Sequence, residues 1–224
     1  DVIVVDTTNP VTPVLVGLTG ECSYTAPVPA PVTTDNCAGT VTGSTTDATT
    51  YNTQGTHVIA WTFDDGNGNA ITVNQNVIIQ DITNPAVSCP GDVTESFDTA
   101  CQFTLLDYTS GASATDNCSS VANITFTQSP AAGTVITGNT VITITASDEV
   151  GNTDTCTFNV TVNDTTHPST PTLADITGQC SATAAAPTTT DNCDGTVAGT
   201  TSDATTYTAQ GTHVIIWTFT DAAG

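Results

Sequence analysis

Internal repetition constrains the fold of this chain more than any other feature of its sequence. The stretch TTDNCAGTVTGSTTDATTYNTQGTHVIAWTF (33–63) recurs almost letter for letter at 189–219. A diverged copy between them carries GASATDNC (111–118) and TGNTVITITASDEVGN (137–152). Self-similarity at a fixed period indicates a series of like modules, each of which is one structural unit.

The repeat boundaries follow from a Pro-ended segment that occurs three times, as VIVVDTTNP, VIIQDITNP and VTVNDTTHP. Alignment of its aspartates gives two repeats of 75 and 83 residues and a third that is cut short. We therefore predict residues 1–5 as the last strand of a preceding repeat, 6–80 as a first repeat, 81–163 as a middle repeat, and 164–224 as a third repeat that is truncated before its last strand.

Each repeat reads as a series of short strands. In THVIAWTF (56–63), Ile59, Trp61 and Phe63 share one face and polar or smaller residues share the other, which is the period of a half-buried strand. THVIIWTF (212–219) repeats this pattern, and Gly/Asn/Asp turns such as DDGNGN (64–69) indicate hairpins. About seven strands in roughly 80 residues predict an all-β fold of tandem immunoglobulin-like antiparallel β-sandwiches. Short linkers that end in proline favour their arrangement as an extended rod.

The charge of the chain excludes several classes of partner. It has no Lys or Arg and 22 acidic residues, which give a net charge of −22. Nothing on the chain can neutralise phosphate, so nucleic-acid binding is excluded and an anionic membrane surface would repel it. The acids are concentrated in linkers and turns, where small cations must screen them. A hydrophobic content of 38% is too high for a disordered acidic tail.

The eight cysteines indicate disulfide bonds and an extracellular or cell-surface location, because they form no CxxC pair and no zinc-type cluster. Two cysteines recur in every repeat, and two more occur in the middle repeat alone. Cysteines that come and go together are most simply bonded together. We therefore predict the pairs Cys22–Cys37, Cys101–Cys118, Cys180–Cys193 and Cys89–Cys156.

Several motifs resemble a known family. TASDEVGNTDTCTFNVTVNDTTHP (145–168), SCPGDV (88–93) and ATDNC (114–118) resemble the HYR domain, or hyalin repeat, an immunoglobulin-like module of adhesion and extracellular matrix proteins. The first and third repeats, with DTTNP, GEC or GQC, TTDNC and QGTHVI-WTF, resemble tandem repeats of large flavobacterial surface adhesins of the gliding-motility type. The resemblance implies a structural or adhesive role and brings no catalytic residues. The outer repeats lack counterparts of Cys89 and Cys156, so it implies that bond only for the middle repeat.

No arrangement of side chains predicts an enzyme. His57 and His213 occupy the same place in their repeats, but the middle repeat has Thr140 there, which favours a packing role. The paired acids Asp64 and Asp65 lie in a tight turn that recurs along the chain, which argues against a glycosidase pair.

The sequence predicts a calcium site more specifically than it predicts any catalytic site. In a sandwich of this order, the linker, the DNC loop and the last hairpin turn share one end of the module, and their carboxylate and amide oxygens are ligands that Ca²⁺ prefers. Asp, Asn and Gly are also common in turns, so DNC can equally serve only as a local turn. The predicted ligands are Asp6, Asp35, Asp64, Asp65, Asn67, Asp81, Asp116, Asp148, Glu149, Asp164, Asp191 and Asp221.

The resemblance also implies sugar modification, since DTT and DTA are similar to an O-glycosylation motif of that bacterial phylum. It would modify Thr7, Thr99 and Thr165.

The leading functional interpretation is a stalk whose partners are neighbouring repeats or like subunits in a filament. The alternatives are a glycan-binding module and a non-catalytic spacer of a secreted enzyme. Aromatic residues make up only 5% of the chain, and Trp61 and Trp217 fall on the expected core face, which disfavours surface glycans as ligands. Residues 2–5 are a strand without a domain of their own, and they can be donated to the third repeat of another copy. The interpretation that we favour is that this sequence is a window onto a longer continuous chain.

Overall fold

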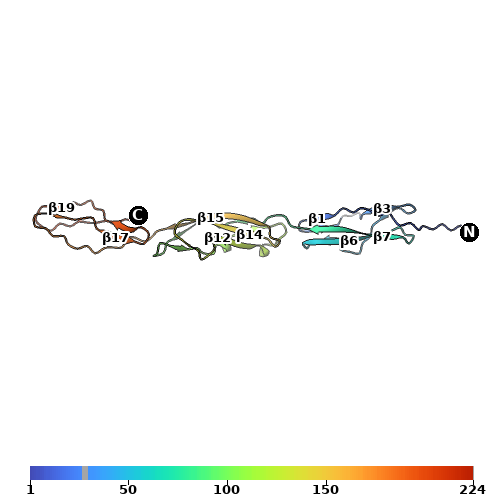
Figure 1. The fold of residues 1–224 in the computed structure, drawn as a ribbon, viewed down its shortest axis with the longest axis horizontal. Coiled ribbons are helices and arrows are strands. Elements are labelled where there is room, and N and C mark those ends of the chain that lie inside the picture. The colour runs from blue at the N-terminus through green and yellow to red at the C-terminus, as the bar shows by residue number, and fades with distance from the viewer. Residues whose placement is uncertain (27–29, 224) are drawn as a thin grey trace. The chain divides into compact units, whose positions relative to one another are not determined.

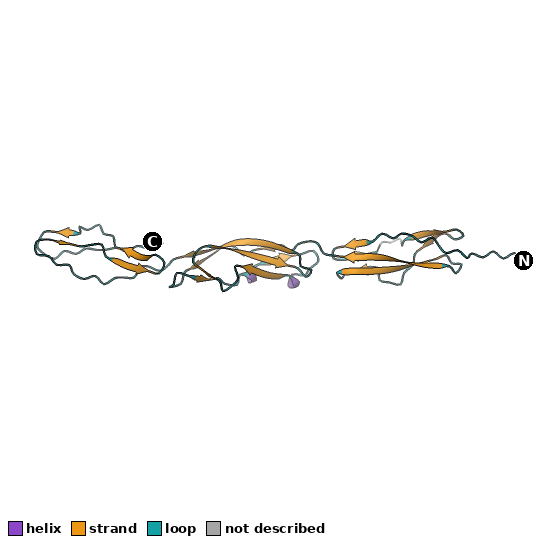
Figure 2. Ribbon diagram, viewed as in Figure 1, coloured by secondary structure: helices purple, strands orange, loops and turns teal. Residues whose placement is uncertain are grey.

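The computed structural model describes residues 1–26 and 30–223, and within them it is an all-β protein with two short 3-10 helices, Thr109–Gly111 and Val121–Asn123 (Figure 2). Gly224, the end of the third repeat, lies outside the described residues. None of the helices in this described part is long and apolar enough to cross a membrane.

The chain forms two compact units that do not coincide with the repeats. Unit 1 contains Asp1–Ala86 together with two loops of the middle repeat, Ala114–Thr125 and Ser147–Asp154. Unit 2 contains Val87–Ser113, Phe126–Ala146 and Thr155–Gly224. The repeat boundaries remain a prediction from the sequence alignment.

The main sheet of unit 1 has the strand order β1-β7-β6 (Figure 1). β6 (Gly55–Asp64) and β7 (Ala70–Ile79) pair antiparallel along their whole length, and β1 (Leu18–Gly20) pairs parallel with the end of β7. The turn that joins β6 to β7 contains Gly66 and Gly68 at positive φ, a backbone conformation that favours glycine. This hairpin places the β6–β7 turn at one end of the sheet and the end of β1 at the other.

The core of unit 1 has the predicted face of β6 at its centre. Ile59, Trp61 and Phe63 are all buried, and they pack with Val77 and Ile79 of β7. The indole N–H of Trp61 donates to the side-chain oxygen of buried Gln75 at 2.9 Å, which satisfies the one polar atom of the ring. The alternating pattern in the sequence therefore predicted this strand and its buried face correctly.

Two pairs of short strands complete unit 1. β3 (Val32–Asp35) pairs with β4 (Gly39–Thr42), and β2 (Tyr24–Thr25) pairs with β5 (Thr50–Tyr51). The β3–β4 turn carries the DNC motif. In the third repeat the same pairs recur as β17 (Thr188–Asp191) with β18 (Gly195–Ala198), and β16 (Ala182–Thr183) with β19 (Thr206–Tyr207).

The middle repeat is built around a four-stranded sheet in the order β12-β14-β15-β9 (Figure 1). Its buried core includes Ile142 and Ile144 from β14, and Phe158 and Val160 from β15. Two further pairs, β11 with β8 and β10 with β13, complete the fold. The bounds are β8 (Ala86–Ser88), β9 (Val93–Ser96), β10 (Phe103–Thr104), β11 (Ser113–Thr115), β12 (Thr125–Ser129), β13 (Val135–Ile136), β14 (Thr140–Ser147) and β15 (Thr153–Asn163).

The strand predicted at 212–219 does not form. In the described part of the third repeat this segment makes only a single bridge, Thr218 opposite Thr200, although β6 has nearly the same sequence. The physical reason is pairing: β6 bonds to β7 along ten residues, and no described residues of the third repeat align with β7. Without that ladder the alternating pattern alone does not hold an extended strand.

Candidate metal centre

Each DNC motif forms a tight turn directly after a short strand, and its aspartate has two different carboxylate oxygens. Oδ1 accepts the backbone N–H groups of the cysteine and of the residue after it, at 2.7–3.0 Å. Oδ2 is buried and has no hydrogen-bond partner in the described structure. A buried carboxylate oxygen without a partner is costly, so it indicates a ligand that brings positive charge. The three aspartates are Asp35, Asp116 and Asp191.

The linker aspartates show the same division between their two oxygens. Oδ1 of Asp81 accepts the N–H of Thr83 at 3.1 Å, and Oδ1 of Asp164 accepts that of Thr166 at 3.0 Å. Oδ2 of both residues is buried without a partner. Asp81 is only 4% exposed. The first linker differs, because Oδ2 of Asp6 accepts a long hydrogen bond of 3.4 Å from the side chain of Asn67.

A third aspartate comes from the hairpin turn between the last two long strands of the first and middle repeats, β6–β7 and β14–β15. Oδ1 of Asp148 accepts the N–H groups of residues 150–152, and its Oδ2 accepts the amide of Asn152 at 2.8 Å. The same amide also lies 3.4 Å from the carbonyl oxygen of Asp81. In the first repeat Asp65 and Asn69 repeat these contacts, with Asn69 donating to the carbonyl oxygen of Asp6. The hairpin turn is therefore fixed against the linker in both copies.

In unit 1 the three kinds of loop meet at one point. Asp81, Asp116 and Asp148 each offer a carboxylate oxygen, and these oxygens all lie within 4.8 Å of one another. Burial, followed by the negative charges of Asp116 and Asp148, raises the pKa of Asp81. The pKa of Asp148 is lowered instead: burial opposes ionisation there, but the hydrogen bonds from Asn152 and the turn amides outweigh it. The chain has no Lys or Arg to neutralise this cluster.

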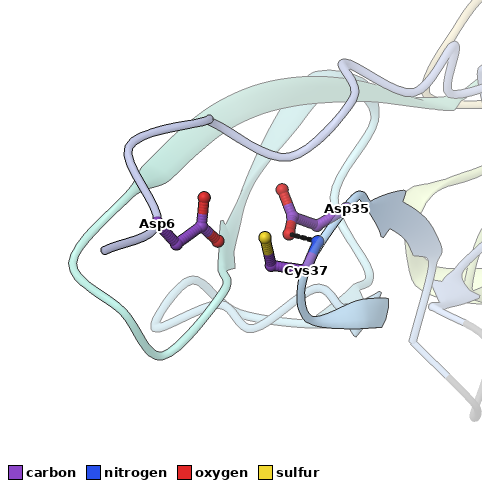
Figure 3. Close-up of side chains that lie close together, drawn as sticks. All are labelled: Asp6, Asp35 and Cys37. Carbon is purple, nitrogen blue, oxygen red and sulfur yellow. Dashed lines mark hydrogen bonds between the residues drawn. The ribbon is translucent and has the colours of Figure 1, made fainter. Parts of the chain in front are cut away.

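Unit 2 contains an equivalent cluster of Asp164, Asp191 and Asp221, which meets the same distance limit. In the first repeat, Asp6 and Asp35 converge with the thiol of Cys37 (Figure 3). Slight burial and the charges of these two aspartates raise the pKa of Cys37, which keeps it a neutral thiol and a poor metal ligand at neutral pH.

Most of the predicted metal ligands therefore come together, but not all of them. Asp64 and Glu149 are exposed: Asp64 accepts the N–H of Gly66 in its own turn, and Glu149 accepts the side-chain amide of Asn123 from another loop. Glu21 was not predicted, yet its carboxylate lies beside Asp81 and accepts the side-chain amide of Asn117 at 2.6 Å. No signal in the repeat alignment pointed to it, because the aligned residues are Ala100 and Gln179.

The structure corrects three of the predicted disulfides. Cys89–Cys156 is present as predicted, but Cys22 is bonded to Cys118. Cys101 is bonded to Cys193, and Cys37 and Cys180 are free. The predicted bonds Cys22–Cys37, Cys101–Cys118 and Cys180–Cys193 are therefore wrong.

The reason for the correction in unit 1 is distance. Cys37 lies beside Asp6, which contacts the β6–β7 turn, whereas Cys22 follows β1 at the opposite end of β7. A ten-residue strand such as β7 is about 33 Å long, and bonded cysteines need Cα atoms within about 7 Å. The bond that does form joins the first repeat to the DNC loop of the middle repeat, with 4.9 Å between the Cα atoms.

Other singled-out residues have simple environments. His57 stacks on Tyr51 and His213 stacks on Tyr207, with ring centroids 4.6 and 4.2 Å apart. The residues of the predicted O-glycosylation motif are exposed, and their modification remains a prediction. They are Thr7, Thr99 and Thr165.

Comparison with solved structures gives only distant similarity. Drosophila N-cadherin EC1-3 is 13% identical over 63% of this chain and 54% of that one, with a TM-score of 0.24. The Protocadherin GammaB4 extracellular domain is 16% identical over 97% of this chain and 44% of that one, with a TM-score of 0.36. The chain thus spans about half the length of each of these structures. These scores are too low to support any argument about function.

No curated protein matches the sequence. The family model that matches is the HYR domain, over residues 80–162. That range coincides with the middle repeat to within one residue at each end. This part of the chain is therefore similar to the HYR domain, and it lies within an all-β chain that carries three disulfides.

Proposed function

We propose that this chain is a structural segment of a secreted or cell-surface filament or adhesin, of the flavobacterial gliding-motility type. In it, tandem immunoglobulin-like modules form an extended stalk. The observation that carries the proposal is the Cys22–Cys118 disulfide, because it joins one repeat to the next beside the carboxylates of Asp81 and Asp116. A covalent bond at that position restrains the two repeats, which is what a stalk under tension requires.

Calcium fits the cluster in unit 1. Asp81 and Asp116 each have one buried oxygen that no described donor satisfies, and Asp148 completes the set of three carboxylates. Glu21 lies beside Asp81 and could add a further carboxylate oxygen. Hard cations with six to eight oxygen ligands prefer this chemistry. When bound, the ion supplies the positive charge that the chain itself lacks.

The metal and the disulfide would act on the same loop. Asp116 and Cys118 belong to one DNC turn, in which Oδ1 of Asp116 accepts the N–H of Cys118 at 2.8 Å. The disulfide fixes this turn to Cys22, and the ion fixes it to Asp81 in the linker. Two independent restraints on one short loop limit rotation about the linker, so calcium would stiffen the stalk.

The experiment compares unfolding of the full chain in 2 mM CaCl₂ with unfolding in EGTA, by differential scanning calorimetry. We expect calcium to raise the Tm by several degrees, because an ion that binds only the folded state stabilises it by mass action. Asp116→Asn removes one ligand of the unit 1 cluster and is expected to reduce the shift. Asp64→Asn, a change of the same kind in an exposed turn outside the clusters, is the matched control.

The same proteins in small-angle X-ray scattering test the stalk itself. We expect calcium to reduce the spread of end-to-end distances of the wild-type chain and of Asp64→Asn, and to have a weaker effect on Asp116→Asn. An identical Tm and scattering curve in calcium and in EGTA would contradict the metal site. A compact scattering envelope in both buffers would contradict the stalk.

A further inference from the structure

The three aspartates of the unit 1 cluster all belong to the same repeat. Asp81 begins the predicted middle repeat, and Asp116 and Asp148 lie in its DNC turn and its last hairpin turn. An ion held by these three carboxylates alone would bind within the middle repeat. To hold the first repeat as well, the ion needs a ligand that the first repeat supplies.

Glu21 is an acid of the first repeat that reaches this cluster. One of its carboxylate oxygens, one of Asp81 and the Sγ atom of Cys118 all lie within 4.8 Å of one another. Asp81 therefore belongs both to this group and to the cluster with Asp116 and Asp148. Asp81 is only 4% exposed, and its Oδ2 atom has no hydrogen-bond partner in the described structure. A buried carboxylate oxygen of this kind indicates a cation at the point where the two groups meet.

Hydrogen bonds hold the Glu21 side chain across the boundary between the two repeats. Its Oε2 atom accepts the side-chain amide of Asn117 at 2.6 Å and the hydroxyl of Thr83 at 2.9 Å. Both donors belong to the middle repeat. The Oε1 atom accepts no hydrogen bond from the residues that the structure describes. Glu21 can therefore bind a cation through Oε1 while Oε2 keeps both bonds.

The backbone around Glu21 is fixed against the linker. The Nε2 group of Gln54 donates to the carbonyl oxygen of Glu21 at 3.0 Å, and its Oε1 atom accepts the N–H of Asp81 at 2.9 Å. The N–H of Gln80 donates to the carbonyl oxygen of Gly20 at 2.9 Å. A Cβ added at Gly20 would lie 2.3 Å from the carbonyl oxygen of Ser23, so this turn is tight. Such rigidity is one of the properties that set calcium affinity.

The corresponding junction in unit 2 shows that the disulfide does not require this acid. Ala100 aligns with Glu21 there, yet the bond Cys101–Cys193 is present. The DNC asparagine, Asn192, donates to the carbonyl oxygen of Asp98 at 3.1 Å. Both DNC asparagines thus contact the preceding repeat, but only in unit 1 is the acceptor a carboxylate. The charge of Glu21 therefore serves something other than the covalent link.

We propose that Glu21 is the ligand through which a calcium ion at the unit 1 cluster binds the first repeat. The ion then joins two repeats instead of binding within the middle repeat alone. This inference rests on the proposed function and deepens it, because it names the residue that makes the cation site a site between repeats.

The test compares amide hydrogen exchange of the full chain in 2 mM CaCl₂ and in EGTA, measured by NMR. Two amides report on the two sides of the site. The N–H of Cys118 donates to Asp116 inside the cluster, and the N–H of Gln80 donates to Gly20 beside Glu21. In the wild-type chain we expect calcium to slow the exchange of both amides.

Glu21→Gln removes the charge and keeps an oxygen that accepts from Asn117 and Thr83. In this variant we expect calcium to slow exchange at Cys118 and no longer at Gln80. Calorimetric titration with CaCl₂ should give a Kd about tenfold weaker, because ligand charge is lost. Glu149→Gln is the matched control: it removes an equal charge from the exposed residue next to Asp148 and should behave as the wild-type chain does.

The outcomes separate this inference from the calcium site itself. For each protein the measure is the ratio of exchange rates in the two buffers, so a change of stability in EGTA does not enter. If calcium slows exchange at Gln80 equally in the wild-type chain and in Glu21→Gln, Glu21 is not the ligand. Slowing at Cys118 alone in the wild-type chain would also overturn the inference and leave the calcium site. Slowing at neither amide would overturn both.

Discussion

Residues 55–64 and 211–220 have almost the same sequence and different structures. GTHVIAWTFD forms β6, in which Ile59 and Phe63 are fully buried. GTHVIIWTFT forms no ladder, and the aligned Ile215 and Phe219 are only partly buried. The difference is the neighbouring strand: β6 pairs with β7, and the described third repeat has no aligned counterpart. An alternating pattern therefore shows which face a strand will bury, but the partner strand decides whether it forms.

Short-range contacts survive in both copies because they do not need that partner. The Tyr–His stack recurs, and so does the hairpin that carries the DNC turn. Both lie within a few residues along the chain or within one hairpin. Structure that depends on local contacts is thus the same in the two repeats, while structure that depends on the β7 ladder differs.

The largest expected effect is on the core tryptophans. Trp61→Ala removes a buried side chain from a paired strand and is expected to lower the free energy of unfolding of unit 1 by about 3–5 kcal/mol. Trp217→Ala, at the aligned and only half-buried position, should cost much less. Urea titration monitored by the NMR signals of His57 in unit 1 and of His213 in unit 2 measures the two changes. Equal losses would show that the third repeat is as well packed as the first.

The next effect concerns the aligned cysteines Cys22 and Cys180. Cys22→Ser opens a disulfide with a sequence separation of 96 residues, and we expect a loss of about 2–4 kcal/mol for unit 1. Cys180→Ser replaces a free thiol and should leave stability unchanged within about 0.5 kcal/mol. Thermal unfolding without reductant compares the two variants. A loss with Cys180→Ser comparable to that with Cys22→Ser would mean that Cys180 is also bonded.

These cysteines show where sequence reasoning stopped. Repetition identified which residues are equivalent, and alternation identified the buried face of β6. Neither feature shows at which end of its module a cysteine lies, and therefore neither shows whether that cysteine faces the neighbouring repeat. Cys22 and Cys37 are close in sequence and separated by the length of β7 in space, so pairing by co-occurrence failed. Cys89 and Cys156 were paired correctly because they occur together only in the middle repeat.

The residues of the metal cluster were predictable from the sequence, but their detailed geometry was not. The linker, DNC and hairpin aspartates recur in every repeat, and the order of strands in a sandwich brings them to one end. Their unpartnered oxygens were not predictable, because they depend on which oxygen of Asp81 or Asp116 the turn amides occupy. Glu21 was missed because only one repeat carries it.

A smaller expected effect is that two carboxylates of one cluster, Asp81 and Asp148, influence stability in opposite directions as the pH changes. Burial and neighbouring charges raise the pKa of Asp81, so its ionised form opposes folding above that pKa, and the opposition disappears as pH falls. Hydrogen bonds lower the pKa of Asp148 despite its burial, so its contribution is present above the unfolded pKa and lost in acid. Without calcium at pH 7, Asp81→Asn should therefore stabilise unit 1 and Asp148→Asn should destabilise it. Urea unfolding checks both signs.

Calcium makes this test more specific, because a bound ion reverses the sign of the stability change that Asp81→Asn causes. In 2 mM calcium the Asp81 carboxylate becomes a ligand, and Asp81→Asn should be less stable than the wild-type chain. Asp148→Asn should be destabilising in both buffers. If Asp81→Asn stabilises the protein equally in calcium and in EGTA, Asp81 does not bind the ion.

The smallest expected effect is an NMR shift of the histidine ring protons, which should be similar in the first and third repeats. The chain has three histidines, so their ring protons are easily resolved by NMR. His57 and His213 each lie against a tyrosine face, and ring currents should shift their protons upfield by similar amounts. His167, exposed and without a ring contact in the described structure, is the internal reference.

Tyr51→Leu and Tyr207→Leu should each remove the shift of one histidine and leave that of the other. A shift for His57 alone would mean that the absence of the β7 ladder also disrupts local structure in the third repeat, and the division between local and ladder-dependent contacts would fail.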